Sequence, residues 1–211
     1  MQPVFEDLRL KRILAMVESG DRLDFDDGVA LYRSPDLLGV GYMANLARER
    51  LHGNYTYFNV NRHINPTDVC VASCRLCAFG KKAKDPKAYT MSLEQVWETA
   101  GRGWSEAVTE FHIVGGLHPE LTLEWYCTML RGLKERFPRV HLKAFTMVEV
   151  AYLARREKLT FAQVLQRLKD AGVESQPGGG AEIFSERVRR IICDHKIDGD
   201  EWLEVARISH R

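Results

Sequence analysis

The sequence predicts an α/β fold, in which a partial TIM-type barrel of about four βα units follows a helical N-terminal extension. After Gly53, segments rich in aromatic and β-branched residues alternate with helical segments, and this order indicates a parallel sheet. Before Gly53, apolar side chains instead recur at helical spacing. We therefore expect two parts: a helical extension at residues 1–53 and an incomplete barrel at residues 54–211.

Two helices are expected in the extension. Residues 5–17 place apolar side chains on one helical face, and Gly20 ends that pattern. Ser34, Pro35 and Asp36 are typical of a helix start, with Ser34 as the N-cap and proline in the first helical position. The apolar positions that follow extend this second helix to Leu51.

In the barrel, strands are expected at residues 55–64, 108–114, 140–145 and 173–175. Helices are expected to begin near Thr122, at Asp198, and at two capping boxes, Ser92–Gln95 and Thr160–Gln163. Parallel barrels place their chemistry at the carboxyl ends of the strands. Three unusual segments follow predicted strands: the cysteine loop (residues 70–77), the glycine loop (residues 115–119) and residues 177–182.

The composition argues against several classes of partner. Thirty basic residues face 29 acidic ones, which gives no electrostatic case for nucleic acid or an anionic membrane. No apolar run is long enough to span a bilayer, and the first dozen residues lack the apolar stretch of a secretory signal. We therefore expect a cytoplasmic protein. In that reducing compartment, five cysteines, three of them crowded together, indicate a metal site.

Cys70, Cys74 and Cys77 form a motif with three and then two intervening residues, just after the first predicted strand. Three thiolates can hold three irons of a [4Fe–4S] cluster and leave the fourth iron open. S-adenosylmethionine (SAM) can chelate that iron, and one electron into its sulfonium releases a 5′-deoxyadenosyl radical. A zinc site with His63 as a further ligand is the alternative, but the spacing and position favour the cluster. The isolated Cys127 and Cys193 are expected to be packing or surface residues.

Several segments resemble the menaquinone and deazaflavin branch of the radical SAM enzymes. They comprise residues 61–70, the cysteine loop, Ala78 and Phe79. Within that branch, residues 112–119, 143–146 and 177–184 are most similar to aminofutalosine synthase. The resemblance implies a radical SAM barrel and a transferase of menaquinone biosynthesis (the futalosine pathway). Such an enzyme adds the adenosyl radical to 3-[(1-carboxyvinyl)oxy]benzoate, and rearrangement with loss of the carboxyl group gives 6-amino-6-deoxyfutalosine.

The resemblance also implies partners and leaves alternatives. The partners are a chorismate-derived enol ether benzoate as substrate and an electron donor such as flavodoxin or ferredoxin. The alternatives are two sister enzymes, cyclic dehypoxanthinyl futalosine synthase and deazaflavin (FO) synthase, and a non-catalytic fragment that binds a cluster. The fragment is considered because six βα units would need about 180 residues, and the residues after Gly53 supply only about four units. An incomplete barrel of this kind is expected to be truncated at the C-terminus.

Besides the cysteines, five residues are expected to contact the cofactor: Gly115, Gly116, Leu76, Phe79 and Glu182. Gly115 and Gly116 occupy the place of a Gly-Gly-Glu turn that contacts the SAM amino group in many radical SAM enzymes, and Leu117 replaces its glutamate. Glycine lets backbone groups approach a ligand closely. Leu76 stands where the family has an aromatic residue near the adenine, and Phe79 follows the last cysteine.

Two further predictions concern titratable side chains. Glu182 follows three glycines, and it either binds the ribose hydroxyls or is an acid favoured by a helix N-terminus. His63, His112 and His118 lie at predicted strand ends or in the glycine loop, and each is either a proton donor or carboxylate ligand or a structural histidine. His118, in the glycine loop, is the candidate catalytic residue.

Overall fold

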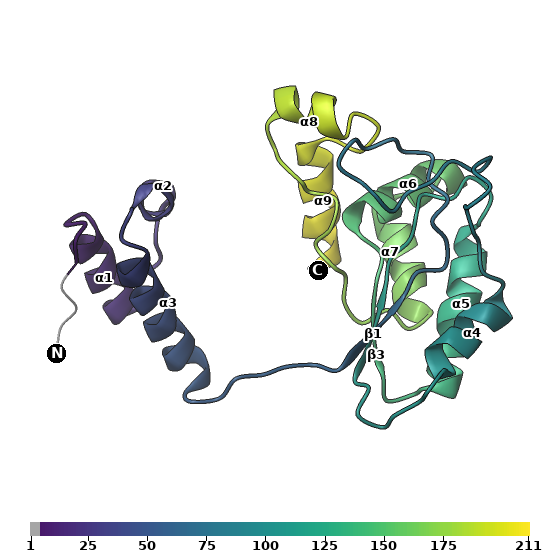
Figure 1. Ribbon diagram of the computed structural model, residues 1–211, viewed down its shortest axis with the longest axis horizontal. Coiled ribbons are helices and arrows are strands. Elements are labelled where there is room, and N and C mark those ends of the chain that lie inside the picture. Colours follow the sequence, from purple (N-terminus) through teal and green to yellow (C-terminus); the bar gives the residue numbers. More distant parts are fainter. Residues whose placement is uncertain (1–4) are drawn as a thin grey trace. The chain divides into compact units, whose positions relative to one another are not determined.

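The computed structural model describes residues 5–211, and the first four residues of the predicted extension lie outside it. The chain divides into two compact units, Met1–Phe58, described from Phe5 onwards, and Asn59–Arg211 (Figure 1). No helix in the described chain combines the length and apolar character needed to cross a membrane.

The first unit contains three helices: α1 (Leu10–Ser19), α2 (Phe25–Arg33) and α3 (Leu37–His52). The first predicted helix begins at Leu10 rather than at residue 5. The second predicted helix is α3, but its N-cap is Asp36 rather than Ser34, because the Asp36 side chain accepts the Gly39 N–H at 2.8 Å. The sequence analysis did not predict α2. The small core of this unit consists of Phe5, Leu10, Ile13, Leu14 and Met43.

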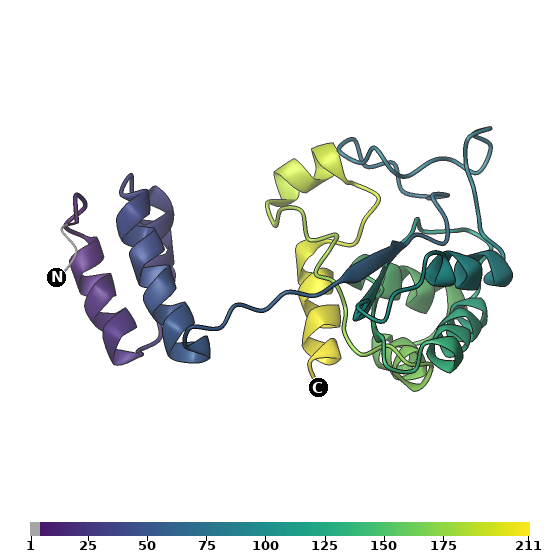
Figure 2. The same cartoon turned by 60° about the horizontal axis from the view of Figure 1, so that its bottom comes forward.

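The second unit contains a parallel sheet in the order β1–β2–β3 within the described residues. The strands are β1 (Asn61–Ile64), β2 (Glu110–Ile113) and β3 (His141–Ala144). The helices are α4 (Leu93–Gly101), α5 (Leu123–Arg136), α6 (Met147–Glu157), α7 (Phe161–Asp170), α8 (Glu186–Ile192) and α9 (Gly199–Ser209). α4 contacts α5, α5 contacts α7, and α7 contacts α9. Figures 1 and 2 show α4 and α5 side by side. The predicted α/β class with a partial parallel sheet is confirmed.

The sheet has one apolar face and one polar face, because successive residues of a strand point to opposite sides. Apart from Arg62 of β1, the side chains of the apolar face join the helices in the main core and are at most 2% exposed: Ile64, Phe111, Ile113, Leu142 and Ala144. The polar face carries two register rows, Asn61–Glu110–His141 and His63–His112–Lys143. Barrel interiors are ordinarily filled with branched apolar side chains, so this polar face is a departure.

Two predicted strands are shorter in the structure. The first was expected at residues 55–64, but Tyr55, Tyr57 and Phe58 are exposed and precede β1, because no strand of the described chain pairs with them. The fourth, expected at residues 173–175, is reduced to one parallel bridge between Lys143 and Ser175. The helices α6 and α8 were not predicted.

The helix starts in this unit are predicted well. Both expected capping boxes form reciprocally, at Ser92 and Gln95 for α4 and at Thr160 and Gln163 for α7. Thr122 caps α5 and Asp198 caps α9 through the N-cap side chain alone, without the reciprocal bond of a capping box. A side chain at the N-cap satisfies an N–H group that the helix leaves free, so the signal lies within four residues of sequence.

A core substitution tests the packing of α5. Leu133 is fully buried between α5 and the rest of the core. We expect Leu133→Ala to lower the free energy of unfolding by about 2–5 kcal/mol, because the removed atoms leave a cavity. The control Leu203→Ala, at a position 44% exposed on α9, should cost clearly less. Denaturant unfolding measures both, and equal losses would contradict the placement of α5.

Candidate functional site

A cavity of about 380 Å³ opens beyond the carboxyl ends of β1 and β2. This volume suits a small-molecule site. Five segments line it: the cysteine loop with the residues just after it, the glycine loop with Val114, the start of α6, Gly180 in the segment 177–182, and Lys196 after α8. The lining side chains and glycines that matter below are Cys70, Cys74, Cys77, Phe79, Lys82, Gly115, Gly116, Thr146, Glu149 and Lys196.

Backbone hydrogen bonds hold the glycine loop against the cysteine loop. The Val71 N–H donates to the Leu117 carbonyl at 3.0 Å. In return, the Leu117 N–H donates to Cys70 Sγ at 3.4 Å. The loops are so close that a Cβ atom at Gly116 would lie 2.1 Å from the Val69 carbonyl oxygen. A glycine is therefore required where the two loops meet.

The sulfur atoms of Cys70 and Cys77 both lie close to Gly80. Gly80 donates its N–H to Cys77 Sγ at 3.3 Å, and a Cβ built on Gly80 would lie within 3.9 Å of both Cys77 Sγ and Cys70 Sγ. Hydrogen bonds to sulfur favour the thiolate form and tune iron–sulfur clusters. At Cys74, burial raises the pKa of the thiol, and the nearby Lys196 charge acts in the opposite direction.

The donor set fits a cluster with three thiolate ligands. The three cysteines line the same cavity, and thiolates are the normal ligands of iron–sulfur clusters. A zinc ion would need four donors within about 2.3 Å. Across residues 5–211, no three His, Cys, Asp or Glu side chains come close enough to hold one metal ion. His63 does not line the cavity, since it stacks on His112 with 4.6 Å between the ring centroids.

The other predicted cofactor residues take different positions. Phe79, Gly115 and Gly116 line the cavity. Leu76 is 50% exposed and is not among the residues that line the cavity. Glu182 forms an ion pair of 2.6 Å with the Nζ atom of Lys196, a cavity-lining residue, and therefore lies directly behind the wall.

His118 is held by structural hydrogen bonds. Its Nδ1 accepts the N–H groups of Glu120 at 3.0 Å and Leu121 at 3.1 Å, so the neutral ring carries its proton on Nε2. Burial and the nearby Arg156 charge lower the pKa of His118, which favours this neutral form. The residue lines a separate small hollow beside Tyr152 rather than the cavity of the cysteines. A role as proton donor stays a prediction.

Glu149 lines the same cavity, and the sequence analysis did not single it out. The residue is 9% exposed. Its Oε1 accepts the Gly115 N–H at 3.1 Å, and its Oε2 accepts the Thr146 N–H at 2.8 Å. Glu149 thus ties the glycine loop to the first turn of α6. The capping box of Thr146 and Glu149 is a local signal for this helix, but the contact with Gly115 spans 34 positions and leaves no local signal.

The buried position of Glu149 predicts a pH-dependent stability. Burial raises the pKa of Glu149 above its ordinary value of 4.5, although its hydrogen bonds act in the opposite direction. The folded chain therefore holds the proton more tightly than the unfolded chain, and stability falls as pH rises above the unfolded value. We expect Glu149→Gln to become more stable relative to the unsubstituted chain as pH rises from about 4 to 8.

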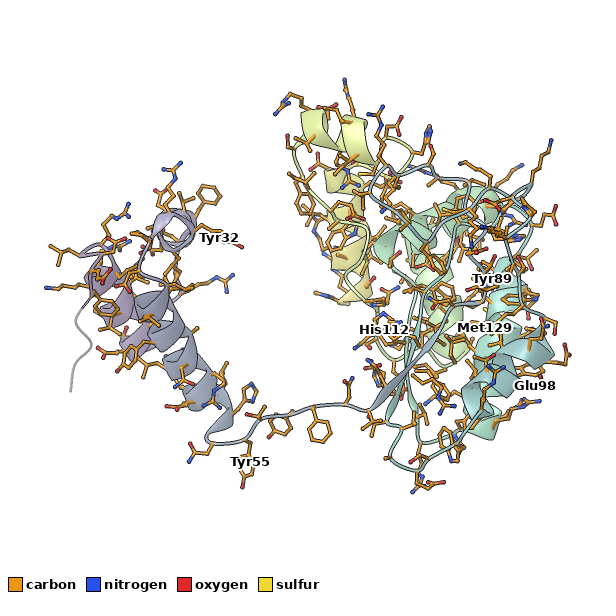
Figure 3. All side chains as sticks on the ribbon, in the orientation of Figure 1. Tyr32, Tyr55, Tyr89, Glu98, His112 and Met129 are labelled. Carbon is orange, nitrogen blue, oxygen red and sulfur yellow. The ribbon has the colours of Figure 1, made fainter. Side chains whose placement is uncertain are left out.

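Urea unfolding at several pH values measures this trend. Glu98 is exposed on α4, as Figure 3 shows, and provides the matched control. The stability difference caused by Glu98→Gln should not depend strongly on pH. A difference for Glu149→Gln that stays constant over the same range would contradict the placement of a buried carboxyl group at this position.

A second polar group occupies the polar face of the sheet, where Figure 3 marks His112. The rings of His63 and His112 stack in the same register row as Lys143. Lys143 Nζ pairs with Glu110 at 2.8 Å. Glu110 is 6% exposed, and its Oε1 has no hydrogen-bond partner within the described chain. A buried, unsatisfied oxygen of this kind indicates a partner outside the described residues, such as water or a ligand.

Comparison with known proteins identifies relatives over almost the whole chain. The family model described as the Radical SAM superfamily matches residues 64–211. The chain is 44% identical to aminodeoxyfutalosine synthase of Streptomyces coelicolor, over 97% of this chain and 53% of the relative. It is 39% identical to the Thermus thermophilus protein of the same name, over 97% of this chain and 55% of the relative.

A relative with a different activity matches almost as well. The chain is 40% identical to 5-amino-6-(D-ribitylamino)uracil–L-tyrosine 4-hydroxyphenyl transferase of Methanopyrus kandleri, over 92% of this chain and 51% of the relative. The chain thus spans about half the length of the curated relatives it matches.

Solved structures resemble the fold at low sequence identity. Methylornithine synthase aligns with a TM-score of 0.70 and 14% identity, over 94% of this chain and 55% of that structure. The hydrogenase maturase HydG from Carboxydothermus hydrogenoformans aligns with a TM-score of 0.58 and 18% identity, over 96% of this chain and 45% of that structure. At these identities the likeness concerns the fold alone, and it agrees with the predicted barrel class.

Proposed function

This chain belongs to the radical SAM superfamily, and from that premise we propose that it forms the cluster and SAM site of an aminodeoxyfutalosine-type transferase. The observation that carries the proposal is the joint placement of Cys70, Cys74, Cys77 and the glycine loop around one cavity. The identity of 44% and 39% to two aminodeoxyfutalosine synthases supports the choice of reaction. The proposed substrate is 3-[(1-carboxyvinyl)oxy]benzoate.

The cofactors of this superfamily are a [4Fe–4S] cluster and SAM. When bound, the cluster passes one electron from a donor of the flavodoxin or ferredoxin class to the SAM sulfonium, which yields methionine and the adenosyl radical. The chain's own residues bind and orient these groups. The three cysteines would hold three irons, and Gly115 and Gly116 would bring backbone groups to the SAM amino group. Contact of Glu182 with the ribose hydroxyls stays a prediction, because its side chain pairs with Lys196 behind the wall.

Water exclusion is the second task of these residues. Phe79 and Val148 give the cavity an apolar wall, and Glu149, which also lines the cavity, keeps the glycine loop in place by accepting the Gly115 N–H. A radical that meets solvent or a loosely held neighbour is lost to side reactions, so a tightly held wall favours addition to the substrate. These roles are proposals for the whole enzyme. This chain spans about half the length of the relatives it matches.

The polar face of the sheet supports an anionic substrate. His63, His112 and Lys143 present imidazole and ammonium donors in one row. Carboxylates are natural partners for such donors. The proposed enol ether benzoate carries two carboxylates, so this row is a suitable place for one of them. The unpartnered Oε1 of Glu110 is an acceptor, so it would take a donor such as water or a substrate hydroxyl rather than a substrate carboxylate.

The deazaflavin branch is the second candidate. The 40% identity to the Methanopyrus kandleri transferase, over 92% of this chain, favours keeping it. The cyclising synthase of the futalosine pathway belongs to the same group of alternatives. These sister reactions differ from the proposed one in the fate of the adenosyl carbon, because they release it as free 5′-deoxyadenosine.

Product analysis separates the candidates. The chain is reconstituted with iron and sulfide without oxygen, then incubated with adenosyl-labelled SAM, dithionite and the enol ether benzoate. The proposal predicts the label in a larger, decarboxylated adduct detected by mass spectrometry. Label found only in 5′-deoxyadenosine would indicate a sister reaction. Intact SAM in the presence of a full iron and sulfide complement would indicate a cluster-binding fragment without activity.

A further inference from the structure

Glu182 and Lys196 form an ion pair, here called the wall pair, beside the cysteine cavity. The Nζ of Lys196 lies 2.6 Å from Glu182 Oε1, and the two side chains are only 15% and 25% exposed. Lys196 lines the cavity together with Cys74. A pair so shielded from solvent exerts a stronger field on its neighbours than a surface pair does.

A buried arginine fixes both members of the wall pair. Arg189 of α8 is 5% exposed. Its guanidinium donates to the carbonyl oxygens of Ala181 and Ile183, on either side of Glu182, and to that of Ile197, directly after Lys196. Glu182 itself has a φ of 52°, a left-handed conformation that a non-glycine residue keeps only when its surroundings impose it. Arg189 supplies that support.

The end of α8 brings the wall pair to the cysteine loop. The Arg75 N–H, next to Cys74, donates to the Ile192 carbonyl at 2.9 Å, and the turn from Cys193 to Lys196 follows at once. Figures 1 and 2 both show α8 beside the loop that follows β1. Lys196 is accordingly among the charges that act on the Cys74 thiol.

The second lysine of the cavity is engaged differently. The Nζ of Lys82 donates to the carbonyl oxygens of Val71 and Ala72, at 2.9 Å and 3.1 Å. The ammonium group of Lys82 is therefore engaged by the backbone of the cysteine loop, which it stabilises. Within residues 5–211, the polar side-chain partner of Lys196 is the Glu182 carboxylate, so the field of Lys196 at Cys74 depends directly on Glu182.

We propose that the charge of Lys196 sets the reduction potential of the cluster and that Glu182 counteracts it. The inference rests on the cluster part of the proposed function and not on the substrate. Reduction adds one electron, supplied by the external donor, so the cluster becomes more negative. A cation beside Cys74 stabilises that reduced state, and an anion beside the cation opposes it. The two members of the wall pair therefore shift the potential in opposite directions.

The test is a redox titration of the reconstituted chain, followed by the electron paramagnetic resonance signal of the reduced cluster in the absence of SAM. Lys196→Met should shift the potential to a more negative value, and Glu182→Gln should shift it to a more positive one. Lys196→Arg, which keeps the charge, should stay close to the unsubstituted chain. Lys169→Met is the matched control, because Lys169 is exposed on α7 and the same charge is removed.

Potential shifts of opposite sign in Lys196→Met and Glu182→Gln distinguish an electrostatic role of the wall pair from a structural one. Loosening of the wall would expose the cluster to solvent in both variants and move both potentials the same way. Shifts of equal sign, or shifts no larger than that of Lys169→Met, would overturn the inference. If Lys196→Met takes up no iron, the sign of the Glu182→Gln shift decides alone. An unsubstituted chain that gives no four-iron signal would overturn the proposed function, and the inference with it.

Discussion

Replacing Cys74 by alanine is expected to abolish the cluster. Cys74 lines the same cavity as Cys70 and Cys77, and an iron site with one open position needs all three thiolates. Iron and sulfide content after reconstitution should fall to the background value, the brown colour should be lost, and SAM cleavage should stop. Metal analysis, visible absorption and detection of 5′-deoxyadenosine measure these three effects.

Cys127 provides the control for this substitution. It is buried in α5, and its Sγ donates a weak hydrogen bond to the Arg167 carbonyl at 3.7 Å. Cys127→Ala should lower the free energy of unfolding by about 1 kcal/mol and keep the cluster. A Cys74→Ala variant that still cleaves SAM would contradict the assignment of the three cysteines.

The cluster motif was predictable because its information is local. Cys70, Cys74 and Cys77 lie within eight positions, and their spacing alone defines the chemistry. The N-caps of α4, α5, α7 and α9 were predictable for the same reason, since a cap and the N–H group it binds are three residues apart. The glycine loop was identified from its composition, and the structure brings it to the cysteine loop.

The supporting residues were not predictable, because their contacts join distant parts of the chain. Glu149 reaches Gly115 across 34 positions. The polar row on the sheet depends on the register of three strands, which sequence alone does not give. The prediction for Leu76 came from the resemblance, in which an aromatic residue at this place lies near the adenine. The Leu76 side chain is 50% exposed and does not line the cavity, and its contact with SAM stays a prediction.

The strand boundaries show a further limit. Tyr55 to Val60 has the aromatic and β-branched composition of a strand, yet β1 begins at Asn61. Composition reports how well a side chain fits a pleated surface, and a strand also needs a neighbour to pair with. Residues 61–64 find β2 as that neighbour. The fourth predicted strand likewise has the right composition but only one bridge to β3.

Gly116→Ala is expected to weaken SAM binding strongly. A Cβ atom there would lie 2.1 Å from the Val69 carbonyl oxygen and 3.1 Å from Cys70 Cβ. Because these neighbours belong to the backbone and to a cluster ligand, neither can rotate away, and the two loops must separate. The separation would also break the hydrogen bond from Leu117 to Cys70 Sγ. Overpacking of this kind costs about 1–3 kcal/mol, which corresponds to binding weaker by about 5- to 150-fold if it falls on the SAM complex.

Equilibrium dialysis of SAM against the reconstituted chain measures this loss, and Gly178→Ala is the control. Gly178 belongs to the other glycine run, a Cβ there would meet no atom within 4 Å, and its φ is not positive. The control should therefore bind SAM like the unsubstituted chain and keep its iron. If Gly116→Ala binds SAM as tightly as Gly178→Ala, the glycine loop is free to move away from the cysteine loop. The close contact at Val69 would then not be the constraint that shapes the cofactor site.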